Sequence, residues 1–162
     1  MLNYKFLKKL NNIFACSRFE AEILDFIKAE LKEKGLSFQE TPFGDLYIGQ
    51  ENPKLMFTAH IDEVGFMVTS FLADGYLQVQ PIGWVKPEML VGRDIELRTE
   101  KGDVVPGIIV YDKPLRVKEV GDWDTLKLDI GAKNENDCQE MEISIPVQGT
   151  YKKVYYETKD KV

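Results

Sequence analysis

The sequence predicts an α/β protein in two parts, a partial α/β segment followed by a small β-barrel or sandwich. Two observations predict this fold class. Apolar residues recur at helical spacing up to about residue 35, whereas short strand-like runs alternate with Gly and Asp turns from Val64 to about Val147. Because the pattern changes near Val64, we expect domains at 1–65 and 66–150, then a terminal strand and charged tail at 151–162.

Two amphipathic helices are predicted at the start of the chain. The apolar residues of Leu2–Phe14 fall on one helical face. Ser17 and Glu20 then have the spacing of a capping box, in which a hydroxyl and a carboxylate satisfy backbone amides at a helix start. A second apolar stripe over Ile23–Leu31 and a following Gly35 predict a helix that ends near that glycine.

Three strands are predicted in the rest of the first part. Leu36–Thr41 and Leu46–Ile48 flank a turn and predict a hairpin. Lys54–Thr58 is mostly apolar, which is typical of a strand buried on both faces of an α/β sheet. It leads into His60, so we expect the only histidine at the carboxyl end of a central strand, where open α/β sheets bind ligands.

The second part contains strand candidates separated by turns. They are Val64–Leu72, Tyr76–Gln80, Asp94–Thr99, Val104–Tyr111 and Thr125–Ile130. A polar loop is predicted over Asp112–Asp124 and one capped helical turn over Asn134–Glu140. Strands at this spacing predict a small barrel or sandwich.

Composition narrows the function classes. The 162 residues are 44% hydrophobic and 30% charged, which excludes the composition of intrinsic disorder. A formal charge of −6 argues against nucleic acid, and no apolar run approaches the roughly 18 residues of a membrane span. Cys16 and Cys138 are too few for a disulfide framework and fit reduced thiols. We therefore expect a soluble cytoplasmic protein.

His60-x-Asp62-Glu63 is the only dense cluster of metal-capable residues in the sequence. An imidazole can ligate a transition metal through one nitrogen while a nearby carboxylate orients the ring. A hydrogen-bonded structural histidine is the alternative, because one histidine and adjacent acids do not complete a metal site. Cys16 with His60 could also form a nucleophilic pair, although a buried structural cysteine is favoured.

Four other acids have a simpler interpretation. Four acids are interpreted as residues of solvated turns: Asp122, Asp124, Glu135 and Asp137. The sequence contains no nucleophile elbow, Walker loop, dinucleotide fingerprint or C-x-x-C pair. These absences leave the histidine cluster as the leading candidate for chemistry.

Several segments together resemble one enzyme family. They are Phe57-Thr-Ala-His60-Ile-Asp62-Glu63-Val-Gly65, Pro81-Ile-Gly83-Trp84, Pro87-x-x-Leu90-x-Gly92, Pro106-Gly107 and Leu128-Asp-Ile-Gly131-Ala132. In this order they resemble the dinuclear metal-dependent aminopeptidases that form tetrahedral dodecamers, called glutamyl aminopeptidases or endoglucanases. The resemblance covers the amino-terminal half of the family pattern.

The resemblance implies an α/β catalytic domain interrupted, after its first metal-binding histidine, by a small PDZ-like β-barrel that helps build the oligomer. It makes His60 a ligand to one of two divalent metal ions, zinc or cobalt. It makes Asp62 a supporting catalytic residue that holds the geometry of the site. The implied substrate is the amino-terminal residue of a peptide.

The family pattern also includes residues that these 162 positions lack: a bridging Asp, a Glu pair, a further Asp and a second His. We therefore expect a truncated metallo-aminopeptidase that is inactive as an isolated chain and binds metal weakly or not at all. Two alternatives stay open, a non-catalytic binding or oligomerisation module and half of a split enzyme completed by another chain. The expected partners are a homo-oligomer or a complementing chain, with a peptide substrate only after complementation, and neither nucleic acid nor membrane.

Overall fold

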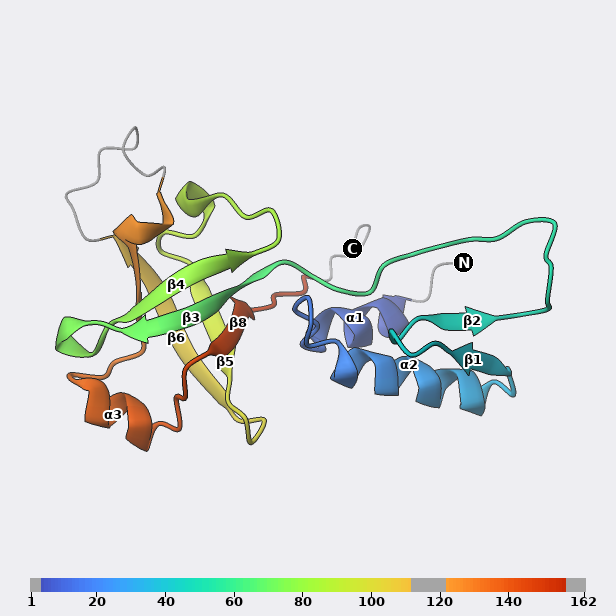
Figure 1. Cartoon of the computed structure of the whole chain (residues 1–162), viewed down its shortest axis with the longest axis horizontal. Helices are drawn as coiled ribbons and strands as arrows, with labels where there is room; N and C mark the ends of the chain where they lie inside the picture. The colour runs from blue at the N-terminus through green and yellow to red at the C-terminus, as the bar shows by residue number, and fades with distance from the viewer. Residues whose placement is uncertain (1–3, 112–121, 157–162) are drawn as a thin grey trace. The chain divides into compact units, whose positions relative to one another are not determined.

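The computed structural model describes residues 4–111 and 122–156 (Figure 1). The chain divides into two compact units, of which the first ends at Asp62 and the second begins at Glu63. Each unit is described by itself below. In the described ranges, no helix has the length and apolar character needed to cross a membrane.

The first unit contains two helices and a hairpin. Helix α1 spans Tyr4–Asn12 and α2 spans Ala21–Glu33. Strands β1 (Phe38–Glu40) and β2 (Leu46–Ile48) pair antiparallel. The two amphipathic helices and the hairpin predicted from the sequence are therefore confirmed; β2 has the predicted bounds, whereas α1 and β1 are shorter than the predicted segments.

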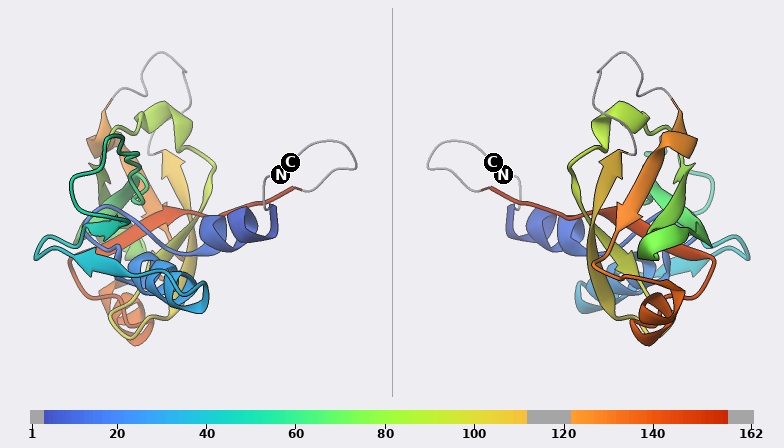
Figure 2. Two further views of the ribbon diagram at one scale, coloured as in Figure 1. Left: turned by 90° about the vertical axis from the view of Figure 1, so that its right-hand side faces the viewer. Right: turned by 90° about the vertical axis from the view of Figure 1, so that its left-hand side faces the viewer.

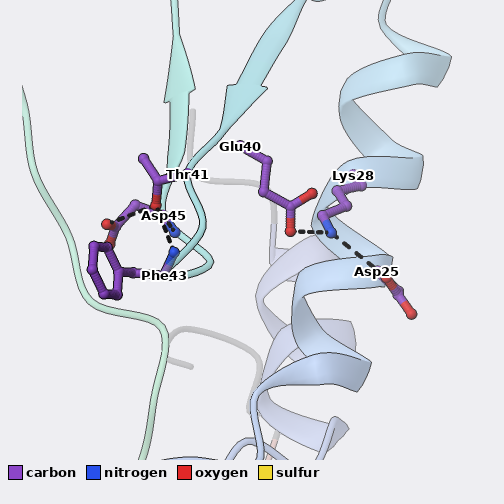
Figure 3. A network of polar contacts seen from close by, with 6 residues as sticks. All are labelled: Asp25, Lys28, Glu40, Thr41, Phe43 and Asp45. Carbon is purple, nitrogen blue, oxygen red and sulfur yellow. Dashed lines mark hydrogen bonds and ion pairs between the residues drawn. The ribbon is translucent and has the colours of Figure 1, made fainter.

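Side chains connect these elements locally. The rings of Phe6 in α1 and Phe26 in α2 stack with centroids 5.9 Å apart. Figure 3 shows Lys28 of α2 reaching Glu40 of β1, with Nζ 2.6 Å from Oε1, while Asp25 lies 3.9 Å from the same ammonium group. The pair is partly exposed, so it adds at most about 1 kcal/mol to stability.

The predicted capping box is wrong. Glu20, not Ser17, occupies the position before α2, and its side chain makes no capping hydrogen bond. Instead, Glu20 Oε1 accepts a hydrogen bond of 2.7 Å from the backbone N–H of Arg18. Arg18 has a left-handed φ of 78°, which turns the chain between Ser17 and α2. The Ser17 hydroxyl instead donates a hydrogen bond to Asp62 Oδ2.

The predicted buried strand at Lys54–Thr58 is also wrong. The segment is not in a strand, and its residues are exposed, Phe57 to 90%. The physical reason is pairing: β1 and β2 form a two-stranded sheet with each other and bond no third strand. A strand needs neighbours for its N–H and C=O groups and cover for its apolar faces. The described part of this unit supplies neither, so His60 does not follow a central strand here.

The second unit is a closed six-stranded barrel in the order β3-β4-β7-β6-β5-β8 (Figures 1 and 2). Its strands are β3 (Gly65–Phe71), β4 (Leu77–Ile82), β5 (Asp94–Arg98), β6 (Val104–Tyr111), β7 (Leu126–Asp129) and β8 (Val147–Tyr151). All neighbouring pairs are antiparallel. The small barrel expected from the spacing of strands and turns is thus confirmed, and closure removes the free sheet edges.

Strand β8 was not predicted, although it completes the barrel between β3 and β5. Its alternation is interrupted by Gly149, which is required by packing, since a Cβ there would lie 2.5 Å from the Phe66 ring. Residues 152–156 are not in a strand, and 157–162 of the expected terminal segment lie outside the described residues. Likewise, 112–121 of the expected polar loop lie outside them.

The barrel core is filled by residues at alternate strand positions. Its fully buried side chains include Phe66, Leu77, Leu97, Leu126 and Leu128. The short helix α3 (Glu135–Glu140) lies at one end of the barrel, beside the turn at Ala73–Gly75. The predicted capped helical turn is confirmed, because Asn134 Oδ1 accepts a 3.0 Å hydrogen bond from the backbone N–H of Asp137.

Candidate functional site

His60 lies near the end of the first unit with its side chain 86% exposed. Its Nδ1 is 3.0 Å from the backbone oxygen of Asp62 and 3.0 Å from Asp62 Oδ1. Both neighbouring atoms are hydrogen-bond acceptors, so Nδ1 carries the proton when the ring is neutral. The second ring nitrogen, Nε2, consequently presents its lone pair. This is the state in which histidine ligates a metal.

Asp62 is held from its other side by a residue far away in the sequence. Ser17 Oγ donates a 2.5 Å hydrogen bond to Asp62 Oδ2. The hydroxyl of Ser17 is the main reason that the pKa of the Asp62 carboxyl is lowered; the His60 ring acts in the same direction and partial burial opposes both. The Asp62 carboxylate is therefore kept ionised, with Oδ2 bound to Ser17 and Oδ1 bound to His60.

Glu63, the third member of the predicted cluster, takes part in a different contact. Its Oε1 lies 2.6 Å from Nζ of Lys153, a largely buried lysine that follows β8. Next to it in the chain, the Val64 carbonyl accepts a 3.3 Å hydrogen bond from Thr150 Oγ1. These contacts attach the chain to the barrel immediately after Asp62. Sequence reasoning missed Lys153 because its position within a charged terminal stretch carried no signal.

The other candidate residues have structural partners. Cys16 is fully buried whereas His60 is exposed, in keeping with a packing role for the thiol. Asp122 Oδ1 accepts from the backbone N–H of Asp124, and Asp124 Oδ1 accepts from Gln80 Nε2. The remaining two acids contribute to α3: Glu135 binds Gln139 and Asp137 binds the backbone N–H of Lys133.

The described residues do not gather a complete metal site. Within 4–111 and 122–156, no three side chains of the His, Cys, Asp and Glu types lie close enough to hold one ion. The arrangement supplies a single oriented nitrogen ligand, with a carboxylate that fixes it.

The fold is that of a mixed α/β protein, with a unit of two helices and a hairpin followed by a closed barrel. Its His-x-Asp motif, in which Asp62 contacts Nδ1 of His60, forms part of a candidate metal centre. Residues 46–162 match the family model described as M42 glutamyl aminopeptidase. That range is more than half of the chain and includes both His60 and the barrel. The chain belongs to the M42 glutamyl aminopeptidase family.

Individual relatives agree with this assignment. The chain is 32% identical to a lysyl aminopeptidase of Pyrococcus furiosus, covering 93% of this chain and 46% of the relative. It is 37% identical over 105 residues to a glutamyl aminopeptidase of Lactococcus lactis, and the match covers 62% of this chain and 30% of that relative. The solved TET1 peptidase of Pyrococcus horikoshii superposes with a TM-score of 0.78 at 28% identity, covering 92% of this chain and 46% of that one. The chain spans less than half of the length of these relatives.

Proposed function

We propose that this chain provides one part of a metal-dependent aminopeptidase site, with His60 as a metal ligand and Asp62 as the residue that orients it. The observation that carries the proposal is the position of the imidazole nitrogen Nδ1 beside two acceptor atoms of Asp62. With its proton held at Nδ1 by these two acceptors, the ring has its Nε2 lone pair available as a metal ligand. The match to the M42 family over this segment supports the same role.

The family is metal-dependent, and the residues present fit part of such a site. His60 would hold one divalent ion, zinc or cobalt in our proposal, and its neutral nitrogen suits either. The chemistry that such ions supply when bound is activation of water for attack on a peptide carbonyl. This chain's own contribution is to present Nε2 and to hold the proton at Nδ1.

The remaining ligands and the general base would come from sequence equivalent to the part of the relatives that this chain does not span. We accordingly propose that residues 1–162 alone do not hydrolyse peptides, and that a complementing polypeptide restores cleavage of amino-terminal residues. Residues 1–65 would contribute to the catalytic domain, and 66–150 would form a PDZ-like barrel that mediates homo-oligomer assembly. The Pyrococcus horikoshii TET1 peptidase, which can assemble into a tetrahedron or a large octahedral shell, supports assembly. Two buried cysteine thiols, Cys16 and Cys138, fit a cytoplasmic location.

Zinc titration of the isolated chain tests the metal role. Because His60 is the only histidine, one imidazole contributes to the ¹⁵N spectrum. We expect weak Zn²⁺ binding that moves the Nε2 resonance, and His60→Ala should lower the affinity at least about 10-fold, as is usual for groups that support a bound metal. Glu51→Ala, which removes an exposed acid of the same unit, serves as the control and should leave binding unchanged.

Two results would contradict this role for His60. One is a tightly held pair of ions per isolated chain, which would require ligands that the described residues do not bring together. The other is unchanged zinc affinity in His60→Ala.

Complementation tests the peptidase role. The purified chain is mixed with the part of the Pyrococcus furiosus lysyl aminopeptidase that it does not match, in the presence of Zn²⁺ or Co²⁺, and release of amino-terminal residues is measured. We expect activity in the mixture only, and a loss of about 100-fold in His60→Ala because a metal ligand is removed. Hydrolysis that survives this substitution would refute the assignment.

A further inference from the structure

Three side chains form a continuous line of hydrogen bonds that ends at the candidate ligand. Ser17 Oγ donates to Asp62 Oδ2 at 2.5 Å, and Asp62 Oδ1 accepts from His60 Nδ1 at 3.0 Å. The two oxygens of one carboxylate are thus used on opposite sides. Ser17 lies 45 positions before Asp62 in the chain, so the fold of the first unit creates this contact.

The backbone around Ser17 is held so that its hydroxyl reaches Asp62. Phe14, Ala15 and Cys16, which precede it, are all buried. The N–H of Phe19 donates 2.8 Å to the carbonyl of Cys16, which closes a turn. Within that turn Arg18 adopts a left-handed φ of 78°, a conformation unfavourable for a residue with a Cβ. Unfavourable backbone of this kind is retained where the surroundings require one geometry.

The consequence for His60 follows from the carboxylate. An Asp62 carboxylate bound on one side only could rotate about its terminal torsion, which has a broad energy profile. With Oδ2 fixed by Ser17, Oδ1 remains opposite His60 Nδ1. The Asp62 carbonyl alone would also accept from Nδ1, so loss of Ser17 should weaken the preference for the Nδ1–H tautomer without abolishing it.

We propose that Ser17 is a positioning residue that acts through Asp62 to keep the proton of His60 on Nδ1 and its Nε2 lone pair available to a metal ion. The metal part of this inference rests on the proposed function, whereas the tautomer part does not. Ser17 touches neither a metal nor a substrate in this role. The competing explanation is that Ser17 only stabilises the turn between α1 and α2.

The tautomer is measurable directly, because the chain has a single histidine. Long-range ¹H–¹⁵N spectra of metal-free chain, recorded at a pH where the imidazole is neutral, give the ratio of Nδ1–H to Nε2–H forms. In Ser17→Ala we expect this ratio to fall roughly 3- to 10-fold, the change that corresponds to the net free energy of one hydrogen bond. Asp62→Asn should lower it at least as far.

Variants separate the hydroxyl from the turn. Ser17→Thr keeps a hydroxyl and should restore the wild-type ratio, while Ser37→Ala removes an exposed serine of the same unit and should change nothing. If circular dichroism shows that Ser17→Ala loses helix, Ser17→Cys replaces it, since a thiol is similar in size but a weaker donor. An unchanged tautomer ratio in folded Ser17→Ala, or in Ser17→Cys where that variant replaces it, overturns the proposal.

Zinc titration of the same samples keeps the two proposals distinct. We expect Ser17→Ala to lower Zn²⁺ affinity about 10-fold, the lower end of the range for partners of metal ligands. A shifted tautomer ratio without any zinc binding at His60 would uphold the role of Ser17 and refute the metal role of His60. Zinc binding at His60 with an unchanged tautomer ratio in Ser17→Ala would uphold the metal role of His60 and refute the positioning role of Ser17.

Discussion

Replacement of Gly75 by alanine is expected to destabilise the barrel by about 2–5 kcal/mol, the sum of a left-handed backbone penalty and an overpacking penalty. Gly75 has φ +77°, and a Cβ there would lie 2.3 Å from the carbonyl oxygen of Ala132. The atoms that the added methyl group would meet belong to the backbone of Ala132 and Lys133, which has little freedom to move. Urea denaturation followed by tryptophan fluorescence measures the loss, because Trp84 and Trp123 both belong to the barrel unit and Trp123 packs against its core.

Gly102→Ala is the matched control for Gly75→Ala. Gly102 also has a left-handed φ, +89°, but nothing lies within 4 Å of the position a Cβ would take. This variant should lose only about 1–2 kcal/mol, the backbone penalty alone. Equal losses in the two variants would show that the contact with Ala132 contributes nothing.

Leu97→Ala is expected to cost about 2–5 kcal/mol, the usual range for a fully buried leucine. Leu97 lies in β5 opposite Val105 of β6 and Gly149 of β8, and it is completely inaccessible to solvent. Its removal leaves a cavity in the barrel core, which the surrounding strands cannot easily close because their backbones are fixed by pairing. The same fluorescence-detected denaturation gives the free energy of unfolding, and a lower midpoint with an unchanged slope is the expected form.

The control for Leu97→Ala is Val104→Ala, at a position on the neighbouring strand β6 that is 45% exposed. Its effect should stay within about 0.5 kcal/mol, as for most surface substitutions. If Leu97→Ala had an equally small effect, the packing of the barrel core described above would be wrong.

Local pattern was sufficient for most elements of this fold. The helical spacing of apolar residues located α1 and α2, and alternation between turn residues located five of the six barrel strands. Strand β8 was not predicted because Gly149 interrupts its alternation of apolar and polar residues. That glycine leaves room for the ring of Phe66, its partner on the neighbouring strand β3, which is a requirement of packing and not of local sequence.

The two wrong predictions have a common cause. The apolar composition of Lys54–Thr58 predicted burial, but burial requires neighbouring strands, and the described part of its unit pairs none with it. The spacing of Ser17 and Glu20 predicted a cap, but the left-handed Arg18 turns the Ser17 hydroxyl to Asp62. In both cases the outcome depended on whether a partner far away in the chain was present: none pairs with Lys54–Thr58 among the described residues, whereas Asp62 accepts a hydrogen bond from Ser17.

The sequence by itself determined the order and type of most elements, the membership of the family through its motif segments, and His60 with Asp62 as the candidate site. These properties depend on residues close together in the chain. Only the tertiary structure decided which atom of His60 is free, which residue holds Asp62 and how the barrel closes. The contact that holds Asp62 and the closure of the barrel depend on residues far apart in the chain, whose geometry is set by packing and backbone pairing. The contact of His60 Nδ1 with Asp62 joins residues only two positions apart, but it depends on a backbone geometry that the residue pattern does not specify.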